Sequence, residues 1–523
     1  QAKKASTAFA VADIEGVEIS HKRFLTGVLL FANKIKQYSP EQNVALMLPS
    51  SGGGAIASMA ILSLGKTLVN LNFTSGKKAL QSAVKQAEVK HIYTSRKFLD
   101  KMYEKGMDLA SFLPESKLLF LEDIKEEIST IARLGMLLQA ILMPANLLRK
   151  RYFTEVSMHD TAAILFSSGS EGPPKGVELS HSNIAANAKQ AAIELGAVSS
   201  DVVMSTLPTF HAFGFAITTL MPLAEGIPIV CHADPTDVAT ISSGIEKYTG
   251  TILVGTPTFL RMYGISKKVS VDSMKSLRLV VAGAEKLRSE VREVFETKFN
   301  KPIYEGYGTT ETSPGASVNL PDIVSKDSEI TQLRNRQGTV GRAFSGTEFR
   351  IIDPDSLDPI PTGEDGLILI GGPQIMKGYL NMPEKTAEAI EIIDGYRWYR
   401  TGDKGHLDED GFLTIVDRYS RFAKIGGEMI SLTNVEEEIL EACNHRDLEV
   451  AATCLPDQRK GEKIVLLATS DLKKEDLIEI LTKAKVNPLH IPNKILNVEE
   501  IPKLGSGKTD FGATKKIAQA NEN

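Results

Sequence analysis

One ten-residue stretch, Ser167 to Gly176, constrains this chain more than any other part of it. It reads SSGSEGPPKG and follows a short apolar run, Thr161 to Phe166, that predicts a buried strand. Downstream, Ser180 is typical of a helix N-cap. Glycines let backbone N–H groups turn toward an anion and a lysine adds charge, so strand, loop and helix predict a phosphate-binding loop. The alternative is a plain surface loop, because the spacing is not that of Walker A.

Composition narrows the class of protein. The chain has 523 residues, of which 42% are hydrophobic and 24% charged, as in an ordinary globular protein of several domains. A net charge of −5 gives no electrostatic case for binding nucleic acid. Three cysteines, at positions 231, 443 and 454, have no disulfide or zinc spacing. The first residue is Gln1 and not methionine, so we expect a fragment of a longer protein, and any targeting segment would lie outside this sequence.

The segment Ile131 to Phe153 is rich in leucine and methionine, is interrupted by Pro144, and ends in an Arg-Lys-Arg cluster. An apolar, basic helix of this kind fits a membrane interface. The alternative, which we favour, is a helical hairpin buried in the core. No apolar run reaches the roughly 18 residues of a spanning helix.

Short apolar strands alternate with helical patterns through the first two thirds of the chain, which predicts an α/β fold with doubly wound sheets. We expect strands at 43–48, 90–94, 205–208, 251–255 and 277–282, and a helix at 54–64. Frequent glycines after Gly338 predict a β-rich subdomain. A small α/β (α+β) module follows, with helices at 433–443 and 474–484, strands near 449–454 and 463–469, and a tail strand. The predicted domains are 1–418 and a mobile 419–523.

Four further clusters carry chemistry. In Tyr304–Glu311 the glycines allow close approach to a flat ring, and Glu311 is a hard oxygen ligand for Mg²⁺. Asp403 follows a predicted strand and suits ribose hydroxyls, and in the pair Asp417-Arg418 the arginine suits ribose or phosphate oxygens. The fourth cluster, Lys503–Thr509, looks like the end of a Walker A loop. We reject that interpretation because position 502 is proline and no helix-sized segment is expected beyond it. Taken singly, each cluster also fits a turn, a helix start or an exposed tail.

The order of these clusters resembles the adenylate-forming superfamily of acyl-CoA synthetases, adenylation domains and luciferases. Its motifs match residues 167–176, 307–311, 399–403 and 502–508. Four further segments of sequence are similar to the acyl-ACP synthetase half of bacterial bifunctional 2-acylglycerophosphoethanolamine acyltransferase/acyl-ACP synthetases. They are 168–172, 281–286, 421–429 and 504–508. In that family an acyltransferase domain with a His-x4-Asp motif comes first. His232 and Asp237 fit that spacing by coincidence, and we expect the acyltransferase outside this sequence.

The resemblance implies ATP and Mg²⁺ as cofactors and assigns roles residue by residue. The nucleotide phosphates would be held by Ser167, Ser168, Gly169, Ser170, Gly172 and Lys175. Adenine would be framed by Gly283, Ala284, Glu285, Glu305, Gly306 and Tyr307, with Gly308, Thr309 and Thr310 completing the nucleotide site. Asp403 and Arg418 would hold the ribose, and Glu311 with Ser168 would hold Mg²⁺.

Three residues are candidate catalytic groups by the same resemblance. Lys508 would bridge the substrate carboxylate and the α-phosphate, and Lys424 would serve the second half-reaction after the C-terminal domain rotates. His211 matches the mouth of the acyl tunnel, and a structural core histidine is the equal alternative. The hinge position is Ser420, where the family commonly has Asp or Lys.

The expected function is activation of a fatty acid as an acyl-adenylate and its transfer to acyl carrier protein (ACP). Because ACP is acidic, a basic docking patch is expected, with the following candidates: Arg418, Arg421, Lys424, Arg459, Lys460 and Lys463. The alternatives are a long-chain acyl-CoA synthetase, with CoA as acceptor, and a membrane-peripheral nucleotide-binding scaffold. The expected location is the cytoplasmic face of the bacterial inner membrane, with contact through 131–153, or otherwise the cytoplasm.

Overall fold

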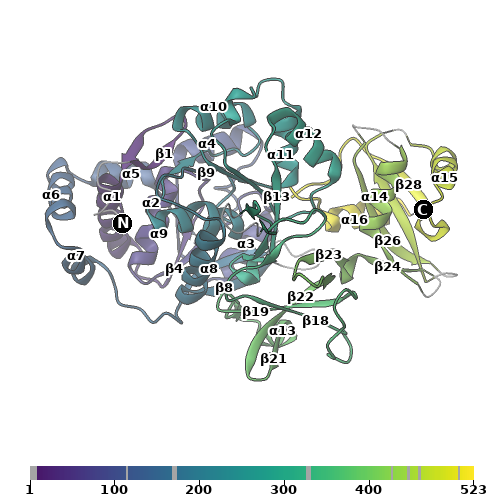
Figure 1. The fold of residues 1–523 in the computed structure, drawn as a ribbon. Helices are drawn as coiled ribbons and strands as arrows, with labels where there is room; N and C mark the ends of the chain where they lie inside the picture. Colours follow the sequence, from purple (N-terminus) through teal and green to yellow (C-terminus); the bar gives the residue numbers. More distant parts are fainter. Residues whose placement is uncertain are drawn as a thin grey trace. The chain divides into compact units, whose positions relative to one another are not determined.

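A computed structural model describes residues 9–113, 116–167, 174–324, 331–425, 428–443, 448–457, 461–470, 472–504 and 507–522 (Figure 1). The described chain forms two compact units. The first contains residues up to 349 together with 370–400, and the second contains 350–369 together with 401–522.

Two sheets form the framework of the first unit. The seven-stranded sheet has the order β20 (Gly378–Tyr379), β8 (Lys175–Ser180), β7 (Thr161–Ser167), β4 (Thr67–Asn70), β3 (Asn43–Leu46), β5 (His91–Thr94) and β6 (Lys117–Phe120). The nine-stranded sheet has the order β17 (Arg342–Ala343), β14 (Gly315–Val318), β13 (Ile303–Gly308), β12 (Leu279–Ala282), β11 (Ile252–Gly255), β9 (Val203–Ser205), β10 (Ile229–Cys231), β1 (Phe9–Asp13) and β2 (Glu18–Ser20). Their central strands are parallel and completely buried, which is why they read as continuous apolar runs.

Helices connect these strands and pack against them (Figure 1). They are α1 (His21–Tyr38), α2 (Gly52–Ser63), α3 (Lys77–Gln86), α4 (Arg96–Glu104), α5 (Leu121–Glu127), α6 (Thr130–Leu142), α7 (Ala145–Tyr152), α8 (His181–Glu194), α9 (Met221–Glu225), α10 (Val238–Tyr248), α11 (Pro257–Ile265), α12 (Ser289–Phe299) and α13 (Pro383–Ala389). Short elements are the π-helix η1 (Phe213–Leu220) and the 3₁₀ turns η2 (Asp272–Met274) and η3 (Thr310–Thr312). Hydroxyl side chains start several helices: Ser51 and Ser95, for example, each accept an N–H of the first turn.

The β-rich subdomain predicted after Gly338 is present. Its sheet has the order β18 (Glu348–Ile352), β19 (Gly366–Gly371), β22 (Tyr396–Leu407) and β21 (Ile390–Ile393), and β23 (Leu413–Arg418) also pairs with β22. A separate two-stranded ribbon consists of β15 (Ile323–Val324) and β16 (Thr331–Gln332).

The C-terminal module has its own sheet and core. Strand order is β25 (Glu428–Ser431), β24 (Phe422–Ile425), β27 (Gly461–Ala468) and β26 (Val450–Asp457), with β28 (Lys494–Asn497) parallel to β27. The remaining elements are η4 (Tyr419–Arg421), α14 (Leu432–Cys443), α15 (Lys474–Lys483), η5 (Pro488–His490) and α16 (Phe511–Ala520). Buried side chains of β26, β27, α14 and α15 form one apolar cluster, so this module buries a core of its own.

The structure confirms the predicted fold class, and the predicted elements shift by only a few residues, as for 205–208, where the strand is Val203–Ser205. Two expectations about helices in other parts of the chain are wrong. A helix, α16, does follow Lys503–Thr509, and it starts where the Asp510 side chain accepts the N–H of Ala513. The segment 131–153 is a pair of helices, as expected, but it is not buried in the core: only Met136, Ala140 and Leu148 are buried there.

Among the described residues, no helix combines the length and the apolar character needed to cross a membrane.

Candidate active site

The predicted phosphate loop connects two antiparallel strands. Ser167 ends β7, Lys175 begins β8, and the two residues face each other across the ladder. Ser168, Gly169, Ser170, Glu171 and Gly172 lie outside the described residues. Strand β8 separates the loop from α8, which corrects the expected strand–loop–helix order. The predicted N-cap is confirmed, because Ser180 and Asn183 form a reciprocal capping box.

A tyrosine connects the loop lysine to the predicted magnesium ligand. The Tyr379 hydroxyl donates a hydrogen bond of 2.9 Å to Oε1 of Glu311, and Nζ of Lys175 lies 5.0 Å from the centre of the Tyr379 ring. All three residues belong to the first unit. Sequence reasoning missed Tyr379. The only signal was its position directly after Gly378, one of the glycines that mark the β-rich region.

Glu311 is buried in η3, and no cation pairs with its carboxylate in the part of the chain that the structure describes. The same part contains no group of three or more His, Cys, Asp or Glu that could hold a metal ion by itself. A single carboxylate suits Mg²⁺, which is commonly bound by one or two carboxylates together with substrate phosphates. The residues present therefore fit the metal that the sequence predicts.

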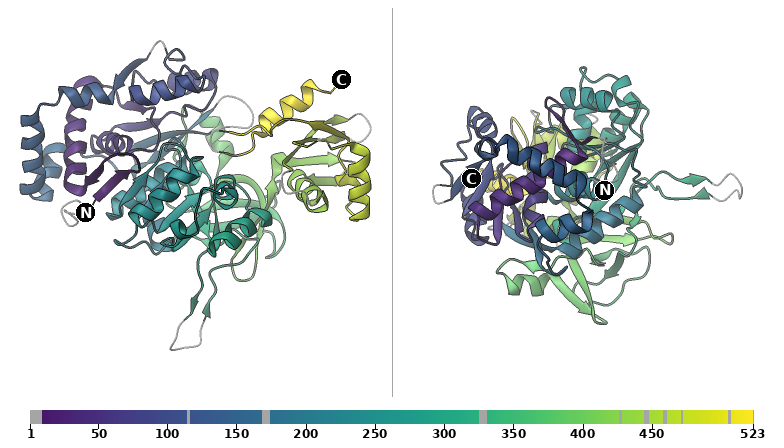
Figure 2. Two further views of the ribbon diagram at one scale, coloured as in Figure 1. Left: turned by 90° about the horizontal axis from the view of Figure 1, so that it is seen from above. Right: turned by 90° about the vertical axis from the view of Figure 1, so that its left-hand side faces the viewer.

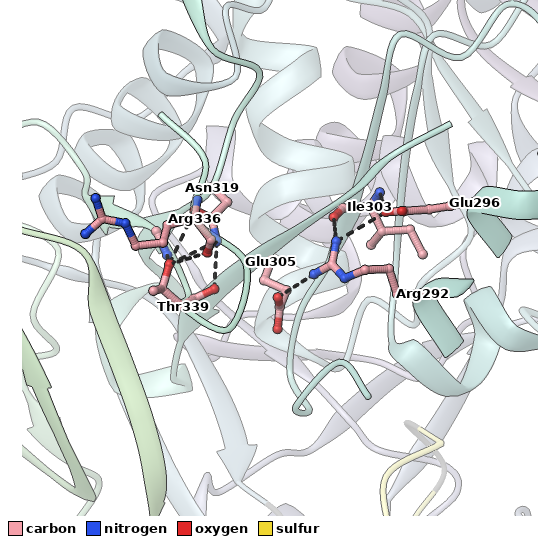
Figure 3. Close-up of polar contacts among 8 residues, drawn as sticks. Arg292, Glu296, Ile303, Glu305, Asn319, Arg336 and Thr339 are labelled. Atoms are coloured by element: carbon pink, nitrogen blue, oxygen red, sulfur yellow. Dashed lines mark hydrogen bonds and ion pairs between the residues drawn. The ribbon is translucent and has the colours of Figure 1, made fainter. Parts of the chain in front are cut away.

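Glu305, six positions earlier, has a different environment (Figure 3). Its Oε2 lies 2.6 Å from Nη2 of Arg292, and this arginine also donates to the Ile303 carbonyl and to Glu296. Burial raises the pKa of Glu305 and outweighs the opposing effect of Arg292. The Glu305 side chain is therefore engaged with Arg292 of α12.

Neighbouring atoms leave no room for a side chain at two glycines, Gly308 in β13 and Gly283 after β12. A Cβ at Gly308 would lie 1.8 Å from the Pro314 carbonyl oxygen, so only glycine fits there. A Cβ at Gly283 would lie 2.9 Å from the ring of Phe213, the first residue of the π-helix. Ala284 has a positive φ of 75°, which is strained for a residue with a side chain. The predicted adenine segments therefore combine close packing with local strain.

The other predicted residues of the first unit lie on these segments. Glu285 accepts a hydrogen bond of 3.1 Å from the hydroxyl of Thr258 in α11. Gly306 and Tyr307 belong to β13 and pair with β14, and Thr309 and Thr310 lead into η3. His211 is half-buried before the π-helix, where its N–H bonds to the Pro208 carbonyl and its carbonyl accepts from Phe215.

In the second unit, Asp403 and Arg418 come together as predicted. They are cross-strand partners on β22 and β23, and Nε of Arg418 lies 3.0 Å from Oδ1 of Asp403. The aspartate side chain is 4% exposed and the arginine side chain 59% exposed. The hydroxyl of Thr401 accepts the Asp403 N–H at 2.9 Å and donates to the Ile368 carbonyl, which fixes the turn before the carboxylate. This arrangement leaves the arginine accessible to a ligand.

Asp417 and Arg421, close to the predicted hinge at Ser420, are tied into the C-terminal module. Asp417 accepts 2.6 Å and 3.1 Å hydrogen bonds from the Ser431 hydroxyl and the Thr433 N–H. Arg421, whose side chain is 12% exposed, pairs with Glu436 at 2.8 Å and stacks on the ring of Phe511. Arg421 therefore cannot belong to the predicted docking patch, a correction that the sequence could not supply because these two partners, Glu436 and Phe511, are 15 and 90 positions away.

The remaining lysines of interest differ in exposure. Lys424 is exposed on β24 and faces Met429 across the ladder. Lys508 is half-buried, and its carbonyl accepts the Leu504 N–H at 2.7 Å, which closes the turn before α16. Lys463 pairs with Glu522 at 3.1 Å, and Arg459 and Lys460 lie outside the described residues.

His232 and Asp237 have a structural explanation. Their side chains lie 3.5 Å apart, and Asp237 caps α10 by accepting the Thr240 N–H. This agrees with the view that their His-x4-Asp spacing is coincidental.

Comparison with known proteins identifies the family. Residues 1–380 match the AMP-binding enzyme family, which is well over half of the chain. The chain is 27% identical over 482 residues to 4-coumarate–CoA ligase-like 8 of Arabidopsis thaliana, covering 89% of this chain and 81% of the relative. It is 29% identical over 357 residues to a long-chain-fatty-acid–CoA ligase of Bacillus subtilis (strain 168), covering 67% and 60%.

Solved structures agree on the fold. O-succinylbenzoate coenzyme A synthetase of Bacillus subtilis, in complex with ATP and magnesium ion, superimposes with a TM-score of 0.77 at 21% identity, covering 97% of this chain and 96% of that one.

The chain therefore belongs to the AMP-binding enzyme family. It is an acid–thiol ligase of the adenylate-forming superfamily, the class that converts an acid and ATP into an acyl-adenylate. This membership confirms the predicted superfamily and the predicted cofactors, ATP and Mg²⁺.

Proposed function

We propose that this ligase activates a fatty acid and transfers the acyl group to the phosphopantetheine thiol of ACP. The observation that supports activation is the contact of Tyr379 with Glu311 beside Lys175, at the end of the predicted phosphate loop. The Glu311 carboxylate and the Lys175 ammonium both lie close to Tyr379, which supports the proposal that the first binds Mg²⁺ and the second binds phosphate.

The proposed chemistry follows from the poor leaving group of a free carboxylate. A carboxylate oxygen attacks the α-phosphate of ATP in line, the bond to the β-phosphate breaks, and pyrophosphate leaves. Phosphoryl transfer of this kind depends on positioning and on neutralising charge. Lys175 and the hydroxyls of the loop would hold the departing phosphates, and Lys508 would hold the oxygens on which charge develops. Attack by a thiol on the acyl carbon then releases AMP.

The nucleoside contacts are proposals of the same kind. Asp403 would accept the ribose hydroxyls with Arg418 beside it, and the segments around Gly283 and Tyr307 would frame adenine. Lys424 is proposed for the second half-reaction and His211 for the mouth of the acyl tunnel.

A second candidate acceptor is CoA. It is favoured by the names of the relatives, which include a long-chain-fatty-acid–CoA ligase. The resemblance of residues 168–172 and 504–508 to acyl-ACP synthetases favours ACP. For ACP, Arg418 and Lys424 are the exposed candidates among the described residues for docking to an acidic partner, and Arg459 and Lys460 stay candidates outside them.

The same resemblance supports a peripheral location on the cytoplasmic face of a bacterial inner membrane, and a preceding acyltransferase domain. Both are proposals, as is the domain boundary after residue 418. A non-catalytic membrane scaffold is the remaining alternative.

The test supplies ATP, Mg²⁺ and a long-chain fatty acid, and then offers ACP or CoA in parallel. Release of pyrophosphate followed by acyl-ACP formation supports the proposal. Acyl-CoA without acyl-ACP would reassign the acceptor, and absence of pyrophosphate release would favour the scaffold. Lys508→Ala should abolish adenylation but spare the conversion of supplied acyl-adenylate, and equal loss of both steps would contradict the role given to Lys508.

A further inference from the structure

Helix α6 has two apolar faces. The inner face is formed by Met136 and Ala140, which are buried, and Met136 clusters with Leu148 of α7 and Leu29 of α1. Figure 1 and Figure 2 show α6 beside α1. The outer face consists of Ile131, Leu134, Leu138, Ile141 and Leu142. At 3.6 residues per turn these five positions fall within an arc of roughly 100°, on the side of the helix opposite to the inner face.

The outer face is exposed to an unusual degree for side chains of this kind. Ile131 is 84% and Leu142 74% exposed, and Leu147 of α7 adds a further 50% exposed leucine. Clusters of exposed apolar side chains mark interaction surfaces, whereas single exposed ones need no explanation. A helix that only needed to cover α1 would have polar residues on its outer side.

The charge around this face is also unusual. Residues 130–153 contain four cations (Arg133, Arg149, Lys150 and Arg151) and no Asp or Glu, in a chain whose net charge is −5. Arg149, Lys150 and Arg151 are exposed at the end of α7. An apolar helix face next to a basic cluster has the two properties that attach a helix to an anionic lipid surface.

We propose that the outer face of α6 and the basic end of α7 form a docking surface for a membrane that contains anionic phospholipid. The inner face holds α6 against α1, so the helix can enter the lipid only sideways. Its five outer side chains then lie among the upper acyl chains, and the three cations of α7 lie at the lipid phosphates. This inference deepens the proposed peripheral location, and it does not depend on which thiol accepts the acyl group.

Flotation with vesicles tests the apolar part of the surface. We expect the chain to float with vesicles of phosphatidylethanolamine and phosphatidylglycerol. Leu134→Glu/Leu138→Glu/Leu142→Glu should weaken the partition constant by at least about 100-fold, because each leucine loses its burial in lipid. The matched control is Ile193→Glu/Val198→Glu/Ile265→Glu, which places the same three charges on exposed apolar positions elsewhere and should leave flotation almost unchanged apart from the added negative charge.

A second variant tests the basic cluster at the end of α7. Arg149→Gln/Lys150→Gln/Arg151→Gln should weaken binding to anionic vesicles by roughly 100-fold and should remove most of the difference between anionic vesicles and phosphatidylcholine vesicles. The control Lys85→Gln/Lys267→Gln/Lys268→Gln removes three exposed lysines elsewhere and should retain that difference.

A tryptophan introduced at one position of the outer face reports how deeply that face enters the lipid, while the other side chains of the face stay unchanged. The sole native tryptophan, Trp398, is 2% exposed, so a second one at Leu138→Trp should be quenched by brominated lipid, and one at Ile193→Trp should not. Exchange of pyrophosphate into ATP is measured on every variant. Lack of vesicle binding with normal exchange counts against this inference alone, and lack of exchange in the unaltered protein counts against the proposed function.

Three results would overturn the proposal. They are absence of flotation by the unaltered protein, unchanged flotation of the triple glutamate variant, and absence of quenching at position 138. If the unaltered protein ignores vesicles but forms a dimer in sedimentation velocity that the triple glutamate variant disperses, the face is an interface with a second copy.

Discussion

Two glutamates on neighbouring parts of the first unit, Glu305 on β13 and Glu311 in η3, show how similar burial can serve different purposes. Both side chains are almost completely buried. Glu305 is neutralised from within by Arg292, whereas the carboxylate of Glu311 receives the Tyr379 hydroxyl. A buried carboxylate that is paired with an internal cation has a structural role, whereas the Glu311 carboxylate, which receives a neutral donor, is the one that we propose for a cation from outside. The contrast distinguishes the residue that supports the site from the one that we propose binds Mg²⁺.

The largest effect is expected on stability, when Glu305 loses the cation that pairs with it. Arg292→Met should lower the free energy of unfolding by about 3–5 kcal/mol, because it leaves a buried carboxylate without its cation. Urea denaturation measures this loss. The Mg²⁺ concentration at half-maximal activity should not change in the folded fraction, and a shift there would erase the distinction between the two glutamates.

For the other glutamate, Glu311→Gln should lower the rate of adenylation by at least about 100-fold, because it removes the carboxylate that we propose as a ligand of Mg²⁺. The measurement is pyrophosphate exchange as a function of Mg²⁺ concentration, with thermal unfolding as the check on folding. Glu305→Gln is the matched control, with its effect expected mainly on stability. Wild-type Mg²⁺ dependence in the Glu311 variant would rule out its role as a ligand.

A smaller effect is expected where the Tyr379 hydroxyl meets Glu311. Tyr379→Phe keeps the ring near Lys175 but removes one hydrogen bond to a charged group, which is worth about 1.5–3 kcal/mol. We expect adenylation to fall by roughly 10-fold and the requirement for Mg²⁺ to rise. Tyr379→Leu also removes the ring, so a larger loss in that variant would measure the contribution of the contact with Lys175.

The smallest effect concerns pH. Burial raises the pKa of Glu305 in the folded state above its ordinary value of 4.5, so the folded protein retains this proton when the unfolded chain releases it. Stability from this group is therefore complete below about pH 4.5 and decreases as the pH rises toward the folded-state pKa, by at most ~1.4 kcal/mol per pH unit. Urea denaturation of the wild type and of Glu305→Gln at several pH values gives this difference, and a difference that grows with pH would reverse the sign.

The sequence predicted what depends on local pattern. Apolar runs located the parallel strands, and the motif order indicated the residues of the candidate site, of which Asp403 and Arg418 prove to be cross-strand partners. It did not predict Tyr379 or Arg292, because their roles depend on contacts with residues 68 and 13 positions away. It also gave strand–loop–helix in place of a hairpin at Lys175, since the buried strand β8 is short and directly abuts α8.

Exposure was the property hardest to predict. The apolar segment 131–153 was expected in the core because leucine and methionine are usually buried. Periodicity cannot distinguish one apolar face from two, and α6 has two. Similarly, Arg421 looked like an exposed cation until its pairing with Glu436 became visible.

The hydrogen bonds that Asp417 accepts from Ser431 and Thr433 affect where a gene fragment for the C-terminal module should start. A recombinant C-terminal fragment that started at residue 419 would lack this carboxylate, and the first turn of α14 would lose the acceptor of the Thr433 N–H. A fragment that starts at residue 401 retains β23 and with it this cap. The second starting point is therefore the better choice for expression, crystallisation or isotope labelling of the module on its own.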